Sequence, residues 1–259
     1  MSNLLNISSS DIIESIRLSC QIPDVVKAIA SKKIILEAAQ EAGVHVEEGE
    51  VQQEADKLRL EKKLVKAKDT WMWLEKHHLS TKDFEELTHY KVLKKKLANH
   101  LFSADLEKFF YEHRLDYDAA VTYEVILESK DLALELFYAL EEGEITFAEI
   151  ARQFIQEPEL RRAGGYVGLK HRKDFRPEIA APVFAASAPS VLKPITTPKG
   201  VYLIWVEEII KSQLDEQLRE KIISELFEQW LKQQIDCLEI VTKLDYDQLQ
   251  PQTEQIKPA

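Results

Sequence analysis

Several side chains in this sequence could do chemistry, and their spacing limits what that chemistry can be. His77 and His78 are metal-ligand types, but neighbouring residues on a helix point about 100° apart. No further histidine follows them at a four-residue spacing, so we expect no metal site and no cofactor. Cys20 and Cys237 are too few and too far apart for a disulfide framework, and nothing here requires an oxidising compartment.

The charge balance limits the partners. The chain has 34 Lys and Arg against 45 Asp and Glu, a formal net charge of −11. Nucleic acids and anionic membranes attract clustered cations, so we expect neither as a partner. The short basic runs Lys94-Lys95-Lys96 and Arg161-Arg162 are interpreted as solvated surface.

No targeting or membrane segment is predicted. The first 20 residues lack a basic stretch, and their apolar residues are separated by Ser, Asp and Glu, which is typical of an amphipathic helix. No stretch approaches the roughly 20 apolar residues of a membrane helix. We therefore expect a soluble, cytoplasmic protein without membrane insertion.

Glycine and proline are concentrated in one window. Five of the seven Gly and six of the nine Pro lie between residues 143 and 200. These residues mark turns and interrupt helices, so this window should be rich in loops and its flanks mostly helical.

The flanks show helical periodicity. Upstream, two helices are predicted over 24–41 and 50–66. A third helix should begin at a cap formed by Ser80 or Thr81, and a fourth should begin at Asp105. We interpret residues 1–117 as a helical lobe. Downstream, one helix is predicted within 210–245; its apolar stripe needs a partner, and we expect it to pack on the N-terminal helices. Residues 246–259 are polar and are predicted to form a flexible tail.

Aromatic residues in the helical lobe allow two interpretations. Trp71, Trp73 and Phe84 follow helical spacing, which favours core positions. A groove for a client polypeptide is the alternative.

The central segment, residues 118–209, mixes strands and helices. Strands are predicted over 121–127, 191–196 and 201–206, and helices over 129–140, 146–154 and 177–184. The glycine-rich stretch 164–168 is predicted as a loop. The fold class is therefore α+β, with a small antiparallel sheet surrounded by helices and inserted into a mainly helical lobe that the C-terminal helix completes.

This segment resembles the parvulin-type (PpiC) peptidyl-prolyl cis/trans isomerases. The resemblance rests on the order and spacing of the run 125–140, the sequence Gly-Gly-Tyr-Val-Gly at 164–168, the stretch 175–184 and the closing Thr-Pro-Lys-Gly-Val-Tyr-Leu-Ile at 197–204. The helical flanks are similar to the chaperone lobe of SurA-type and PrsA-type foldases. The resemblance implies isomerisation of X-Pro bonds in proline-containing or unfolded polypeptides.

The resemblance also implies a site. The apolar slot for the proline ring falls on Val167, Phe175 and Ile179, with Phe184 behind them. Among the polar positions, the two family histidines fall on Glu124 and Tyr202. A Cys or Asp position falls on Glu157 or Glu159, and a threonine position is retained at Thr197.

Two functions remain open. The first is a prolyl isomerase and foldase whose polar residues are Glu124, Glu157, Thr197 and Tyr202. The alternative is a noncatalytic chaperone or adaptor that keeps the slot but has lost the histidines, and that serves peptide export or maturation. The sequence leaves the clients and the oligomeric state undetermined.

Overall fold

The computed structural model describes residues 5–242, which divide into two units. The first unit takes its residues from the chain up to Asp105 and from Glu220 onward, and the second spans Leu106–Arg219. The second unit extends beyond the predicted range 118–209 at both ends. It does so because the helix before the first strand packs within it: Tyr117 O lies 3.2 Å from His171 Nδ1.

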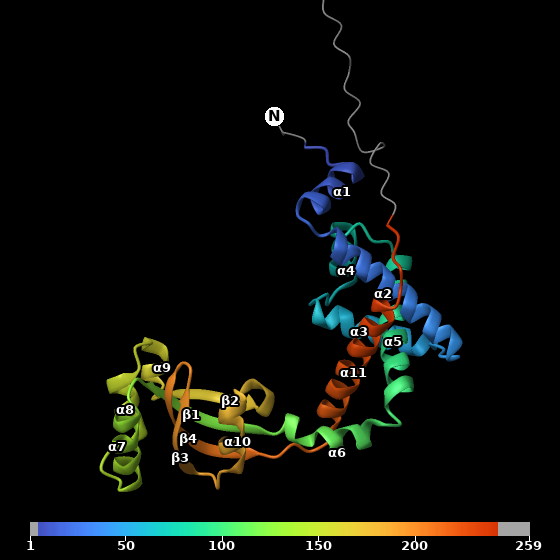
Figure 1. Cartoon of the computed structure of the whole chain (residues 1–259). Coiled ribbons are helices and arrows are strands. Elements are labelled where there is room, and N and C mark those ends of the chain that lie inside the picture. Colours follow the sequence, from blue (N-terminus) through green and yellow to red (C-terminus); the bar gives the residue numbers. More distant parts are fainter. Residues whose placement is uncertain (1–4, 243–259) are drawn as a thin grey trace, which may run out of the picture. The chain divides into compact units, whose positions relative to one another are not determined.

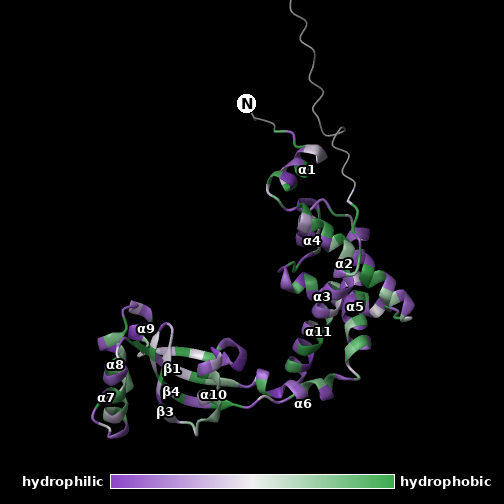
Figure 2. Cartoon of the chain, in the orientation of Figure 1, coloured by the Kyte–Doolittle hydropathy of each residue, from purple (hydrophilic) through white to green (hydrophobic). Residues whose placement is uncertain are grey.

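The first unit is entirely helical in its described part. Each helix carries both hydrophilic and hydrophobic residues, as amphipathic helices around a shared core do (Figure 2). The predicted cap of the longest helix is confirmed: Ser80 Oγ accepts from the Asp83 N–H at 3.1 Å, and Asp83 Oδ2 accepts from the Ser80 N–H at 2.8 Å. The helices are α1 Ser9–Leu18, α2 Ile22–Glu41, α3 Glu48–Glu61, α4 Ala67–Lys76, α5 Thr81–Phe102 and most of α11 Glu216–Asp236.

The lysine run on α5 has a role that the sequence did not indicate. Lys94, Lys95 and Lys96 each face a carboxylate on another helix, at 3.4 Å, 2.7 Å and 2.7 Å respectively. The partners of Lys94 and Lys95 are Glu228 and Glu220 of α11, which lies beside α5 in Figure 1. These exposed pairs each contribute little, about 0–1 kcal/mol.

The last helix is shorter than predicted. It runs from Glu216 to Asp236, within the predicted range 210–245, and residue 210 at the start of that range belongs to a strand. Its buried face consists of Ile222, Ile223, Phe227 and Leu231. The predicted flexible tail, 246–259, lies outside the described residues. No helix between residues 5 and 242 has both the length and the apolar content needed to span a bilayer.

The second unit is built on a four-stranded antiparallel sheet in the order β2-β1-β4-β3. The α+β class is therefore confirmed, but the predicted glycine-rich loop is wrong in part, because it leads directly into β2. Gly168, with φ of +81°, pairs with Thr122 beside an irregularity in the ladder, where glycine's freedom is needed. The elements are α6 Leu106–Tyr117, β1 Ala119–Leu127, α7 Lys130–Glu141, α8 Phe147–Phe154, α9 Pro158–Arg162, β2 Tyr166–His171, the 3₁₀ turn η1 Arg172–Asp174, α10 Pro177–Ala185, β3 Ser190–Thr197 and β4 Gly200–Ile210.

The sheet has two faces made from alternate residues of the same strands. Val125 and Leu203 face one core, which α7 and α8 cover. Ile204 and Tyr202 face the other, which includes Val183 of α10. Figure 1 shows α7 and α8 together on one side of this unit and α10 beside the strands. The two faces therefore have separate coverings.

Candidate functional site

The polar floor of the candidate site comes from the two central strands. Glu124 pairs with Ile204 in the β1–β4 ladder, so its side chain lies on the same face as Tyr202. The backbone of β1 is fixed at this point by the glycine pair Gly164-Gly165, because the Glu124 N–H donates to Gly165 O at 2.8 Å. A side chain on Gly165 would lie 3.1 Å from Glu124 O. The glycines thus allow two backbone segments to approach closely at the site.

Glu124 is held by two donors. Lys170 Nζ of β2 donates to Glu124 Oε1 at 2.9 Å, and Thr122 Oγ1 donates to the same oxygen at 3.3 Å. The side chain of Glu124 is 12% exposed and that of Lys170 31%. The ion pair is therefore largely shielded from solvent, where its attraction is stronger than at the surface.

Tyr202 is buried next to this carboxylate. Burial is the main reason that the pKa of Tyr202 lies above its ordinary value, and the negative charge of Glu124 raises this pKa further. The nearby Arg176 has a smaller effect in the opposite direction. Tyr202 is consequently a neutral phenol at physiological pH, able to donate one hydrogen bond.

Apolar side chains of α10 and the turn before it pack beside Tyr202 and form the apolar wall of the site. Phe175 and Ile179 are buried with Tyr202 in one core, and Phe184 packs on it half-buried. The rings of Phe175 and Phe184 meet edge to face at 5.8 Å. The structure thus brings together Phe175, Ile179, Phe184 and Tyr202, as the predicted slot requires.

Two cations lie over this wall. Lys170 Nζ lies 5.5 Å from the centroid of the Phe175 ring, and Arg172 Cζ lies 5.4 Å from that of Phe184. Both distances are within the range of a cation–π contact. Two cationic side chains, one of them paired with Glu124, therefore flank the slot.

The other predicted site residues are placed differently. The hydroxyl of Thr197 forms hydrogen bonds within the β3–β4 turn. It donates to Gly200 O at 3.0 Å and accepts from the Lys199 N–H at 3.1 Å. Glu157 is the exposed residue that precedes α9, and within the described part of the chain no side-chain bond links it to Glu124 or Tyr202. Glu159 pairs with Arg162 of the same helix at 3.3 Å.

Val167 also stays apart from the rest. It is half-buried on β2 and belongs to neither of the two cores. The roles predicted for Val167, Glu157 and Thr197 remain predictions.

Sequence reasoning missed Lys170. Because the stretch 164–168 is predicted as a loop and no strand is predicted directly after it, the sequence gives no alternation that would place Lys170 on the face of Thr122 and Glu124. Lys170 lies two residues after Gly168, and alternation along a strand places these two residues on the same face. This spacing is the signal that could have identified Lys170.

Comparison with known proteins supports the assignment of this unit. Residues 101–220 match the family described as the PPIC-type PPIASE domain. The chain is 21% identical over 225 residues to a protein named foldase protein PrsA from Caldanaerobacter subterraneus, covering 81% of this chain and 68% of that protein. It is 25% identical over 118 residues to one named chaperone SurA from Alkalilimnicola ehrlichii, covering 41% of this chain and 27% of that protein.

The chain is also similar to a solved structure over most of its length. The peptidylprolyl isomerase PrsA from Bacillus cereus is 18% identical, with 95% of each chain covered and a TM-score of 0.46.

The family match concerns the central segment: residues 101–220 are similar to the PPIC-type PPIASE domain. In the helical flanks as well as this domain, the chain is similar to the PrsA and SurA group of foldases and chaperones.

Proposed function

We propose that this protein catalyses cis/trans isomerisation of X-Pro bonds in unfolded or precursor polypeptides, with the slot on the α10 face of the sheet as its site. The observation that carries the proposal is the placement of Glu124 and Tyr202 on one face of the sheet, opposite Phe175 and Phe184. An apolar wall can hold a proline ring, and a polar floor can act on the bond that precedes it.

The chemistry needs no covalent step. The barrier to rotation of a peptide bond is about 18–20 kcal/mol, because rotation breaks its conjugation. As the bond twists, the nitrogen regains its lone pair and becomes a better hydrogen-bond acceptor. A buried, neutral phenol such as that of Tyr202 can donate to it, and a donor that binds the twisted form better than the planar one lowers the barrier.

Glu124 would act through Tyr202 and Lys170. Its charge favours the protonated state of Tyr202, and the ion pair at 2.9 Å fixes Lys170 at the edge of the slot. Glu124 is thus a positioning residue in this proposal, and Tyr202 is the one that contacts the substrate. A cytoplasmic location, expected from the sequence, is part of the proposal.

The test is the rate of cis/trans interconversion of a short Ala-Pro peptide. We expect the unaltered chain to exceed the uncatalysed rate, Tyr202→Phe to lose roughly tenfold or more in kcat/KM, and Glu124→Ala to lose less. Tyr138→Phe, an exposed tyrosine of α7, is the matched control and should change nothing. An unaltered chain that works only at the uncatalysed rate would end the enzymatic proposal.

A second function is favoured by a specific observation. Phe175 and Ile179 are only 8% and 3% exposed, and Thr197 is engaged in its turn, so little of the slot is open to a substrate. A noncatalytic chaperone or adaptor would need no open slot. It would suppress aggregation of an unfolded client equally well with and without the Tyr202→Phe change.

A further inference from the structure

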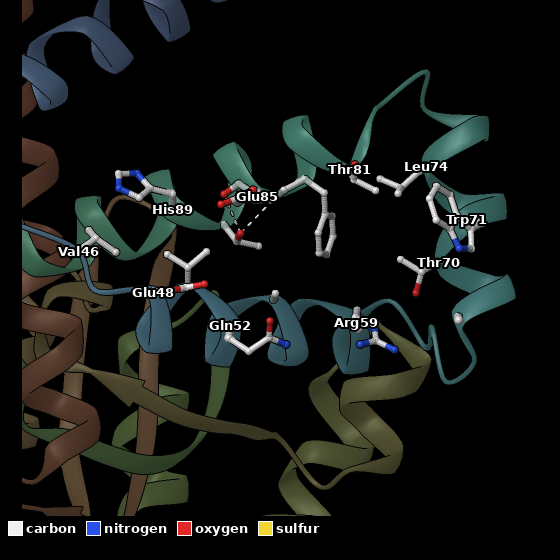
Figure 3. Close-up of a pocket in the computed structure, with 15 residues that line it drawn as sticks. Val46, Glu48, Gln52, Arg59, Thr70, Trp71, Leu74, Thr81, Glu85 and His89 are labelled. Carbon is white, nitrogen blue, oxygen red and sulfur yellow. Dashed lines mark hydrogen bonds between the residues drawn. The ribbon is translucent and has the colours of Figure 1, made fainter.

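Aromatic side chains lie open in one unit and covered in the other. In the helical unit, a groove of about 690 Å³ lies among α3, α4 and α5 (Figure 3), and Trp71 on its wall is 62% exposed. In the second unit, both rings of the apolar wall lie beneath cations, Phe175 beneath Lys170 and Phe184 beneath Arg172. The slot is therefore covered by side chains, which the proposed isomerisation does not require.

Lys170 spans the space between the polar floor and the apolar wall of the slot. Its Nζ lies 2.9 Å from Glu124 Oε1 and 5.5 Å from the centroid of the Phe175 ring. Phe175 is only 8% exposed, so the free surface of its ring is small, and Lys170 lies over it. Apolar groups in contact approach to about 4.0–4.5 Å. A proline ring packed on Phe175 and the Lys170 ammonium therefore exclude each other.

The backbone that carries the two cations is fixed. β2 pairs with β1 as far as His171, and the Arg172 N–H donates to Asp118 O at 3.0 Å. His171 Nδ1 also lies 3.2 Å from Tyr117 O. The side chain of Lys170 is 31% exposed and has several single bonds about which it can rotate. Uncovering the slot therefore needs rotation of side chains and no movement of the strand.

The charge of Glu124 favours the covered state. The side chain of Glu124 is only 12% exposed, so its attraction for Lys170 is stronger than that of a surface pair and is only partly screened by salt. A substrate has to displace the ammonium from this carboxylate before it reaches Phe175. The apparent affinity of such a site is reduced by the fraction of chains in which it is open.

We propose that Lys170 and Arg172 form a side-chain gate over the slot, which opens when Lys170 leaves Glu124 and Arg172 leaves the ring of Phe184. The gate rests on the proposed function, because it controls access to the same site. It weakens binding of the planar and the twisted X-Pro bond alike. The gate therefore raises KM and leaves kcat unchanged.

The test measures binding of a short, uncharged Ala-Pro peptide with blocked ends to the full chain by NMR titration, together with the isomerisation kinetics of the same peptide. Lys170→Ala removes the side chain that covers Phe175. We expect about threefold to tenfold tighter binding, as for a slot that is open in about 10–30% of the unaltered chains. Lys193→Ala, at an exposed lysine of the other edge strand β3, is the matched control and should bind as the unaltered chain does. Circular dichroism verifies that both variants fold.

Two further variants separate the parts of the gate. Lys170→Met keeps the length of the side chain but loses the ion pair, and we expect about twofold tighter binding. Arg172→Ala uncovers Phe184 while the pair of Lys170 with Glu124 stays, and should also tighten binding about twofold. Raising NaCl to 0.5 M should tighten binding to the unaltered chain more than to Lys170→Ala, because screening weakens the covered state. If Lys170→Ala fails to fold, these two variants decide the matter.

The gate is refuted if a folded Lys170→Ala chain binds the peptide no more tightly than the unaltered chain, or if none of these chains binds it. It is also refuted if Lys170→Ala lowers kcat at an unchanged KM, because Lys170 would then serve the reaction and not cover the site. Tighter binding by Lys170→Ala, in chains that never exceed the uncatalysed rate, would refute the proposed catalysis and leave the gate standing.

Discussion

The two faces of the four-stranded sheet are built from the same strands but differ in the residues that those strands contribute. Toward α7 and α8, the strands contribute Val125 and Leu203, both almost fully buried among other apolar residues. Toward α10, the same strands contribute Glu124 and Tyr202 together with the fully buried Ile204 and Val206, and Lys170 comes from β2.

Only the first of these faces is chemically uniform. A buried charge or hydroxyl costs free energy unless it is paired, so a polar face persists where it serves a purpose. The α7 face should therefore serve stability alone, whereas the α10 face combines a structural role, through buried residues such as Ile204, with the proposed activity.

The largest expected effect comes from the apolar face. Leu203→Ala removes a fully buried side chain and leaves a cavity, so we expect a loss of about 2–5 kcal/mol in the free energy of unfolding. Urea denaturation measures it. Tyr202→Phe, the neighbouring residue on the other face, should cost far less. Equal losses would show that the two faces do not differ in this way.

The junction between the glycine pair and β1 comes next. Gly165→Ala places a side chain at φ of +85° and 3.1 Å from Glu124 O, and we expect a loss of about 1–3 kcal/mol. Gly143→Ala is the matched control, because Gly143 has φ of +73° but nothing within 4 Å of the added carbon. Urea denaturation of both variants separates the close approach from the backbone strain. Identical losses would mean that the approach to Glu124 is unimportant.

The ion pair on the polar face should have an intermediate effect. Lys170→Met leaves the Glu124 carboxylate with the Thr122 hydroxyl as its remaining side-chain donor among the described residues, and we expect a loss of about 1–2 kcal/mol. Adding Glu124→Gln should recover part of that loss, because the unpaired charge is removed. Urea denaturation of the two single variants and the double variant measures the coupling.

A surface pair provides the control for this cycle. Lys95 and Glu220 meet at 2.7 Å, but their side chains are 65% and 56% exposed. Lys95→Met should therefore cost less than about 1 kcal/mol. If it costs as much as Lys170→Met, the shielding of the Glu124 pair has no energetic consequence.

The sequence predicted the parts of the fold that local patterns determine. The cap at Ser80, the helix of α10 and the α+β class follow from capping residues, periodicity and the order of elements. Strand β2 was missed because three glycines in five residues indicate a loop, although pairing with β1 overrides that local preference.

The candidate site could be predicted only in part. Phe175, Ile179 and Tyr202 follow from spacing within the resemblance, and the structure brings them into one core. Lys170 could not be found in this way, because its contact with Glu124 depends on the register of two strands 46 residues apart. The groove in the helical unit depends on how three helices pack, which periodicity does not specify.

The smallest expected effect is on the pH dependence of stability. Because the pKa of Tyr202 is raised in the folded chain, the unfolded chain loses this proton first as the pH rises through about 10. The free energy of unfolding should therefore fall between the unfolded and the folded pKa of Tyr202, and be unaffected by this group at neutral pH. Tyr202→Phe should make that alkaline decrease shallower, whereas Tyr138→Phe, on an exposed part of α7, should not. Urea denaturation between pH 8 and pH 11 measures the difference. Parallel curves for the two variants would show that the polar face holds its tyrosine no differently from the protein surface, and the contrast between the two faces would then rest on the Glu124–Lys170 pair alone.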